Sequence, residues 1–103
     1  MKIIYIPELL ALIKKRPGAF LRNNSILELE AYLNGYKFHR FTMEEVPIQD
    51  IEDFNYFRNI WIYDRLKIEN KEGWINCLFT RAVDDKEAFS LFFDLWEEYT
   101  ANT

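Results

Sequence analysis

Few residues of this 103-residue chain could carry out covalent chemistry. An activated nucleophile needs a thiol or hydroxyl beside a base, and the chain has one cysteine, Cys77, and one histidine, His39. Both lie in strongly apolar stretches, where a cysteine usually acts as an inert small hydrophobic residue. The sequence contains no glycine-rich phosphate loop, no paired histidines at metal spacing and no G-x-S-x-G motif. It therefore predicts no enzyme active site, no cofactor and no metal site.

Carboxylates are the chemically distinctive group in this sequence. Residues 44–53 include five of them and no basic residue: Glu44, Glu45, Asp50, Glu52 and Asp53. Such a segment is either a solvated connection with helix-capping carboxylates or a docking surface for a basic partner. For the docking surface we add three residues of the following segment, whose two tyrosines lie off its apolar stripe: Tyr56, Tyr63 and Asp64.

The net charge of −4 is distributed unevenly along the chain. Residues 1–40 carry seven basic and three acidic side chains, whereas residues 41–103 carry six basic and fourteen acidic ones. An acidic domain is repelled by phosphate backbones, so we expect a basic protein partner and no nucleic acid. The apolar N-terminal stretch is interrupted by Pro7 and Glu8, so we expect no signal peptide, no membrane span and a cytoplasmic location.

The composition is typical of one self-contained domain. Half of the residues are hydrophobic and 17% are aromatic, and aromatic side chains bury large areas each. A chain of this length fits one hydrophobic core. A single cysteine allows no internal disulfide, which suits a reducing compartment. We therefore expect residues 1–103 to form a single domain.

Proline and capping residues mark the first two predicted helices. Pro7 suits a first helical turn, and Pro17 ends the apolar run that follows it. Ser25 and Glu28 form an S-x-x-E capping box, in which the hydroxyl accepts a first-turn amide and the carboxylate reaches back. A second helix is expected to begin there. Gly35 on that helix predicts the close approach of another element.

Three further apolar stripes at helical spacing complete the chain. The first follows Asp50, a predicted helix cap, although residues 59–63 are rich in β-forming side chains and leave a short strand open. The second begins at Trp74. The last follows Asp84 and Glu87, which repeat the capping pattern. The sequence thus predicts an all-α bundle of four to five helices, with a possible short strand in its middle.

The sequence also resembles a family of small bacterial proteins that typically read R-P-x-M-Y-L-G…S-I…L-x-A-F-L-x-G-Y. The matching residues are Arg16, Pro17, Phe20, Leu21, Ser25, Ile26, Leu29, Ala31, Tyr32, Leu33, Gly35 and Tyr36. The family tends to close with E-A-F-x-L-F-F-x-L-x-x-E-[aromatic], matched by Glu87, Ala88, Phe89, Leu91, Phe92, Phe93, Leu95, Glu98 and Tyr99, with Trp74 as its mid-chain tryptophan. Arg22 stands where the family commonly has Gly, and arginine would strain a left-handed turn there.

This family is similar to immunity proteins found beside polymorphic bacterial toxins, including those of contact-dependent growth inhibition systems. The resemblance implies a protein that binds a cognate toxin domain, often a nuclease, and blocks its active site or substrate groove. It assigns no binding residue, because immunity proteins vary most at the surface that meets the toxin. The alternative is a small acidic helical adaptor or regulatory protein-binding module without a toxin partner.

Overall fold

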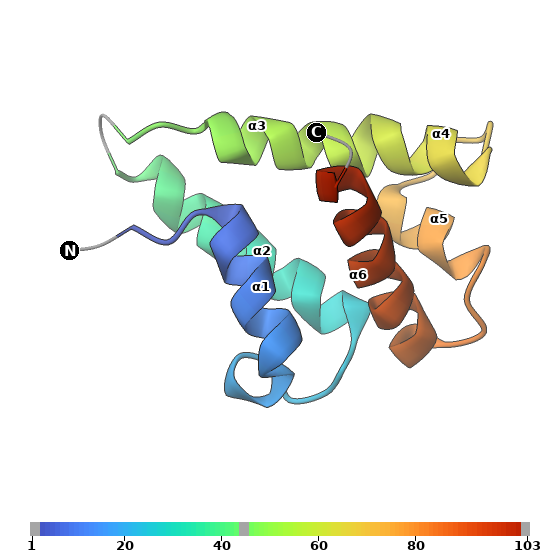
Figure 1. The fold of residues 1–103 in the computed structure, drawn as a ribbon, viewed down its shortest axis with the longest axis horizontal. Coiled ribbons are helices and arrows are strands. Elements are labelled where there is room, and N and C mark those ends of the chain that lie inside the picture. Colours follow the sequence, from blue (N-terminus) through green and yellow to red (C-terminus); the bar gives the residue numbers. More distant parts are fainter. Residues whose placement is uncertain (1–2, 44–45, 102–103) are drawn as a thin grey trace.

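The computed structural model describes residues 3–43 and 46–101, and these residues form an all-α domain (Figure 1). The elements are α1 (Ile6–Lys15), a 3-10 turn η1 (Pro17–Ala19), α2 (Ile26–Phe41), α3 (Gln49–Tyr56), a π-helical segment η2 (Phe57–Trp61), α4 (Ile62–Leu66), α5 (Trp74–Phe79) and α6 (Asp85–Ala101). The predicted fold class is confirmed. The short strand considered at residues 59–63 is wrong, because these residues continue a helix.

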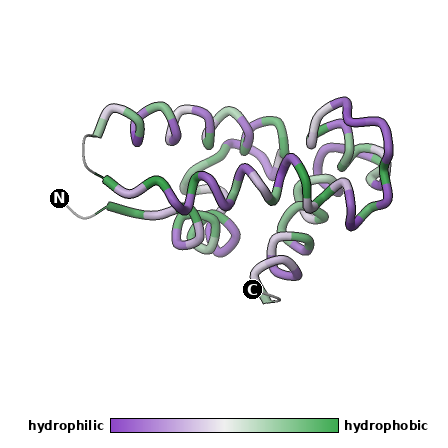
Figure 2. The backbone as a smooth tube through the Cα atoms, turned by 90° about the horizontal axis from the view of Figure 1, so that it is seen from above, coloured by the Kyte–Doolittle hydropathy of each residue, from purple (hydrophilic) through white to green (hydrophobic). Residues whose placement is uncertain are grey.

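The segments α3, η2 and α4 follow one another without a break and form one helical rod over residues 49–66. In Figure 1 this α3–α4 rod lies along one edge of the molecule, and α1, α2 and α6 lie below it. Apolar and polar positions alternate along the helices in Figure 2, as expected when each helix turns one face inward. No helix in the described part of the chain is long and apolar enough to span a bilayer.

An aromatic cluster forms the centre of the hydrophobic core. Phe57 is fully buried, and its ring centroid lies 5.0 Å from that of Trp96, 5.1 Å from Tyr99 and 5.8 Å from Phe92. Offset and edge-to-face ring pairs at such distances add to the stability gained from buried area. The α3–α4 rod is therefore joined to α6 by aromatic packing.

The predicted capping box at the start of α2 forms only in part. The Ser25 hydroxyl accepts the Glu28 amide at 3.2 Å, as expected. The Glu28 carboxylate, however, accepts the backbone amides of Arg22 (2.9 Å) and Asn23 (3.2 Å). It also accepts the side-chain amide of Asn23, which is the largest cause of the lowered pKa of Glu28. Glu28 therefore shapes the turn that precedes the helix.

A carboxylate from the far end of the chain completes this helix start. Asp85, in the first turn of α6, accepts the Ile26 amide at 2.7 Å and the Ser25 hydroxyl. The N-termini of α2 and α6 are thereby joined. Arg22 does not adopt the left-handed conformation, since Lys67 is the only described non-glycine residue with a positive φ. The corner at residues 16–28 holds the shape of the domain without strain at Arg22.

Of two other predictions from the sequence, the cap at the start of α6 is confirmed and the close approach at Gly35 is not. At the start of α6, the Glu87 amide donates to the Asp84 carboxylate at 2.8 Å, as the capping pattern predicts. Gly35, by contrast, is exposed on α2, and a Cβ atom there would meet nothing within 4 Å. The predicted close approach of another element at Gly35 is wrong.

Candidate partner-binding face

The eight residues predicted to bind a partner fall into three groups. Glu44 and Glu45 lie outside the described residues. Asp50 and Tyr63 are largely buried, with an Asp50 side chain that is 11% exposed and a Tyr63 that is 4% exposed. The other four are partly or fully exposed along the α3–α4 rod: Glu52, Asp53, Tyr56 and Asp64.

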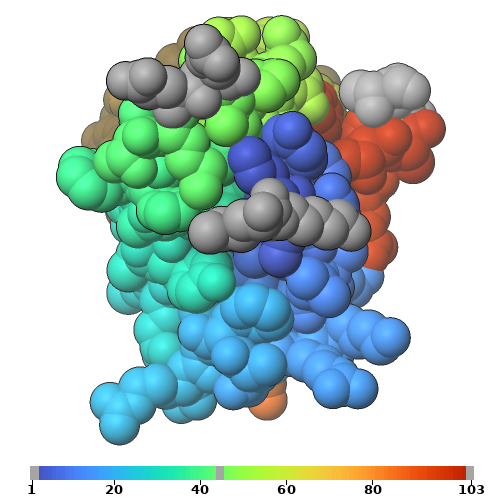
Figure 3. All heavy atoms as spheres, turned by 90° about the vertical axis from the view of Figure 1, so that its left-hand side faces the viewer, coloured from blue at the N-terminus to red at the C-terminus, as the bar shows by residue number. Residues whose placement is uncertain are grey.

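Asp50 belongs to a buried ion pair where the N-terminus of α1, the C-terminus of α2 and the start of α3 meet; this end of the molecule faces the viewer in Figure 3. The Arg40 guanidinium donates to both Asp50 carboxylate oxygens, at 2.8 and 2.9 Å. Asp50 also accepts the Ile6 amide at 2.9 Å. Arg40 further donates to the Tyr36 hydroxyl (2.7 Å) and the Pro47 carbonyl (2.6 Å). These bonds tie three helices together.

This arrangement keeps the Asp50 carboxylate charged and engages both of its oxygens in hydrogen bonds within the domain. Burial alone would raise the pKa of Asp50, but the hydrogen bonds from Arg40 and the Ile6 amide lower it below its ordinary value. The α3 helix begins at Gln49, two residues earlier than a cap at Asp50 would require. The predictions that Asp50 caps its helix and faces a partner are therefore wrong.

Tyr63 is turned inward by the π-helical segment. Tyr56 and Tyr63 are seven residues apart, a spacing that places two residues on one face of a regular α-helix. Within η2, however, the Ile62 amide bonds to the Phe57 carbonyl five residues back. The extra residue in this turn rotates the following positions by about 100° around the axis. Tyr63 is buried and its hydroxyl accepts the Gly73 amide at 2.8 Å, so the predicted exposed contact is wrong.

The outer side of the rod carries the remaining predicted residues and two others. We call this row the acidic face: Glu52, Asp53, Tyr56, Asn59, Ile60 and Asp64. Tyr56 is 49% exposed and Ile60 is 41% exposed, and they lie between Asp53 and Asp64 along the rod. Every exposed charged side chain from residue 49 to residue 64 is a carboxylate. The face thus has an apolar centre with carboxylates at both ends, and the exposed Arg65 that follows Asp64 forms an ion pair with Glu98.

Asp53 is held in place from the neighbouring helix. The Tyr99 hydroxyl on α6 donates to one Asp53 carboxylate oxygen at 2.6 Å. Burial, followed by the hydrogen bond to Asp53, raises the pKa of Tyr99, so this hydroxyl stays protonated and keeps donating. No other hydrogen bond to the Asp53 side chain is present among the described residues. Asp53 is therefore fixed in position while its second oxygen is available to a partner.

The only cation of this stretch, Arg58, lies beneath the acidic face. It is buried, and its guanidinium carbon lies 4.7 Å from the ring centroid of Phe54 and 5.5 Å from that of Trp74. It donates one hydrogen bond to Asn55, and its Nε has no partner within the described residues. Burial lowers the pKa of Arg58, and the nearby Glu30 opposes this effect. Because Arg58 faces inward, it does not neutralise the acidic face.

The two residues considered for covalent chemistry have unlike surroundings. Cys77 is buried on α5, and this burial raises the pKa of its thiol, which leaves it protonated and a poor nucleophile. His39 is exposed on α2. Within residues 3–43 and 46–101, no three His, Cys, Asp or Glu side chains are grouped so that they could hold a metal ion.

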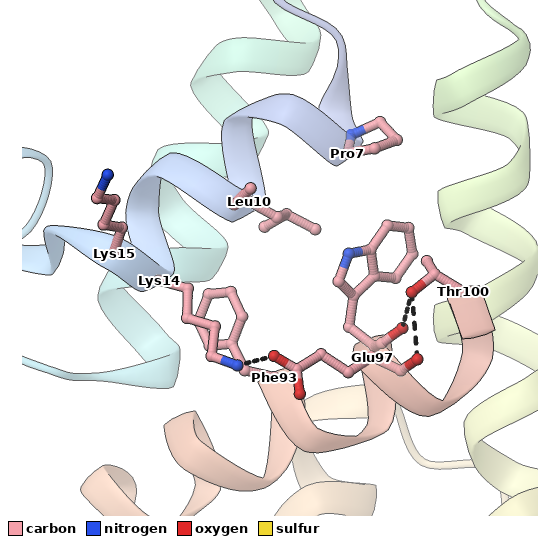
Figure 4. Close-up of a pocket in the computed structure, with 9 residues that line it drawn as sticks. Pro7, Leu10, Lys14, Lys15, Phe93, Glu97 and Thr100 are labelled. Atoms are coloured by element: carbon pink, nitrogen blue, oxygen red, sulfur yellow. Dashed lines mark hydrogen bonds and ion pairs between the residues drawn. The ribbon is translucent and has the colours of Figure 1, made fainter.

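A groove between α1 and α6 is the second surface feature, and sequence patterns gave no sign of it. Its volume is about 510 Å³, and it is lined by Pro7, Leu10, Ala11, Lys14, Lys15, Phe93, Trp96, Glu97 and Thr100. In Figure 4, Lys14 of α1 and Glu97 of α6 form an ion pair at one end of the groove. These two charges neutralise each other, which leaves Lys15 as the one charge of a mainly apolar lining without an ion-pair partner among the described residues.

Comparisons with known proteins add no relative. No protein-family model, no curated protein and no solved structure matches the chain. The resemblance to immunity proteins therefore stays a prediction, and the function is argued from the surface itself.

Proposed function

We propose that this chain is an immunity protein that binds and neutralises a cognate bacterial toxin domain through the acidic face. One observation carries the proposal: every exposed charge along residues 49–64 is negative, and exposed Tyr56 and Ile60 lie among these charges. An apolar centre with a charged surround is the usual composition of a protein-binding site, and tyrosine is enriched at binding hot spots. The sequence resemblance supports the class of partner.

The chemistry of the face fits a basic partner such as a nuclease domain. A nuclease binds phosphodiesters through basic residues, and carboxylates can occupy the same basic groove in place of phosphates. Opposite charges also steer the two proteins together and raise the association rate. The function expected of the face is occlusion of the substrate groove, with no catalytic step in this chain.

A helical adaptor that binds a basic protein other than a toxin would use the same face, so the partner decides between the two functions. The direct experiment is co-expression with the product of the adjacent upstream gene, with cell survival as the readout. We expect this chain to restore survival and an unrelated acidic protein of similar size not to restore it. An absence of both rescue and complex formation would overturn the immunity function.

Two variants test the face within the same experiment. Tyr56→Arg places a cation at the centre of the acidic face, where a basic partner would be repelled, and we expect rescue to be lost. The matched control is Phe38→Arg, because Phe38 is 74% exposed on α2, outside the face. It should rescue as the wild type does. Equal rescue by both variants would contradict binding through the acidic face.

A further inference from the structure

The side of α1 that faces solvent carries apolar residues that the core does not use. Leu12 is 44% exposed, although the neighbouring Leu9 and Ile13 are buried, and Ile4, two residues before α1 begins, is 39% exposed. These exposed residues contribute to a hollow of about 500 Å³ on the surface. We call its lining the α1 outer face: Ile4, Glu8, Ala11, Leu12 and Lys15. None of these residues belongs to the acidic face.

The two charges of the α1 outer face are unmatched within the described chain. Lys14, next in sequence, forms an ion pair with Glu97, but neither Glu8 nor Lys15 makes an ion pair with any described residue. Both side chains are exposed. Glu8 lies in the first turn of α1 and Lys15 in the last, so a negative and a positive charge lie on either side of Ala11 and Leu12.

This order of charges is complementary to itself in the antiparallel direction. If a second α1 lies antiparallel across a twofold axis midway between residues 11 and 12, Glu8 of each copy faces Lys15 of the other. The same axis places Leu12 of each copy opposite Ala11 of the other, where a small side chain allows helices to approach closely. An interface of this symmetry requires one patch that complements itself, and the α1 outer face meets that condition.

We propose that the α1 outer face binds a second copy of this chain, as an antiparallel α1–α1 pair with two reciprocal Glu8–Lys15 ion pairs. The complement of the face is present in the chain itself, whereas a foreign helix would have to supply the same pattern independently. This inference does not depend on the proposed toxin partner, because it uses residues outside the acidic face. Either proposal can fail without the other.

The test is a charge swap followed by sedimentation equilibrium of the full chain over a range of concentrations. We expect a monomer–dimer equilibrium for the wild type. Glu8→Lys and Lys15→Glu should each weaken dimerisation by about tenfold, because two attractive pairs become repulsive. The double variant Glu8→Lys/Lys15→Glu should restore it, because the pairs re-form with exchanged signs. Circular dichroism of each variant verifies that α1 still folds.

Mixing the two single variants gives the sharpest result. At positions 8 and 15, Glu8→Lys carries only positive charge and Lys15→Glu carries only negative charge. The mixture should therefore form heterodimers more tightly than either variant self-associates. Glu69→Lys, an exposed charge reversal elsewhere, is the matched control and should leave dimerisation unchanged. A wild type that stays monomeric, single variants that dimerise like the wild type, or a double variant that fails to recover would each overturn the proposal.

Discussion

Asp50 and Glu52 lie two positions apart on the same helix and differ in almost every physical respect. The Asp50 side chain is 11% exposed and forms a two-pronged ion pair with Arg40. Glu52 is exposed and has no ion-pair partner among the described residues. The comparison shows that the described carboxylates of residues 44–53 differ in role. Asp50 holds helices together, Glu52 is exposed without an ion-pair partner, and Asp53 is exposed but also accepts a hydrogen bond from Tyr99 on α6.

The two buried arginines show a related difference. Arg40 donates four hydrogen bonds, two of them to Asp50, whereas Arg58 donates one and lies against two aromatic rings. Removal of one partner from a buried ion pair is strongly destabilising, because the other charge stays buried without compensation. The stability of the fold should therefore depend on the Arg40–Asp50 pair far more than on any carboxylate of the acidic face.

The largest expected effect is that of Asp50→Asn. This change leaves the Arg40 cation buried without its counter-ion, and we expect a loss of about 3–5 kcal/mol in the free energy of unfolding. Urea denaturation of the variant and the wild type measures it. A loss below about 1 kcal/mol would show that Asp50 is no different from a surface carboxylate.

The same ion pair predicts a dependence of stability on acid pH. The pKa of Asp50 is lower in the folded protein than its ordinary value, so its contribution is fully present above that ordinary value and is lost as the pH falls through the folded pKa. Stability should decline as the pH drops below about 4, and Asp50→Asn should flatten this decline. Thermal unfolding at a series of pH values measures both. An equal decline in the variant would assign the acid sensitivity to other groups.

An uncharged position extends the comparison of buried and exposed sites. Gly35 lies inside α2 with free space around it, so Gly35→Ala should raise the free energy of unfolding by about 0.5–1 kcal/mol through the greater helix propensity of alanine. Urea denaturation measures this gain. A destabilised Gly35→Ala would mean that another element does approach the helix there.

The smallest expected effect on stability is that of Glu52→Gln/Asp64→Asn. Both side chains are exposed and neither has an ion-pair partner among the described residues, so the free energy of unfolding should change by less than about 0.5 kcal/mol. Thermal unfolding at neutral pH provides the measurement. A large loss would place these carboxylates with Asp50 in the set that holds the fold together.

Much of the fold could be predicted from local sequence signals. The helices and the all-α class were indicated by the prolines, by the capping pattern of Asp84 and Glu87, and by the spacing of apolar residues. The predicted close approach at Gly35 was wrong, because a glycine in a helix does not show whether another element lies nearby. The strand considered for residues 59–63 is also wrong, since this segment continues the helix that begins at Gln49 and places Trp61 against Tyr99 of α6.

The candidate site could be predicted only in part. Charge composition indicated the acidic stretch, but the inward turn of Asp50 depends on Arg40, ten residues away in the chain and on another helix. The predicted exposure of Tyr63 was wrong because one π-helical turn changes the face of every later residue. The spacing of residues in the sequence does not predict such a turn. The burial of Arg58 had no sequence signal, because it depends on rings contributed by two separate elements.

The most direct test of the acidic face is the association rate with the proposed toxin partner, once co-expression has identified it, measured at low ionic strength. Glu52→Gln/Asp64→Asn is compared with Glu69→Gln/Asp94→Asn, which removes two exposed carboxylates elsewhere. We predict that the first pair slows association about tenfold with little change in dissociation, and that the second pair has almost no effect. Equal association rates for the two variants would contradict partner binding through the acidic face.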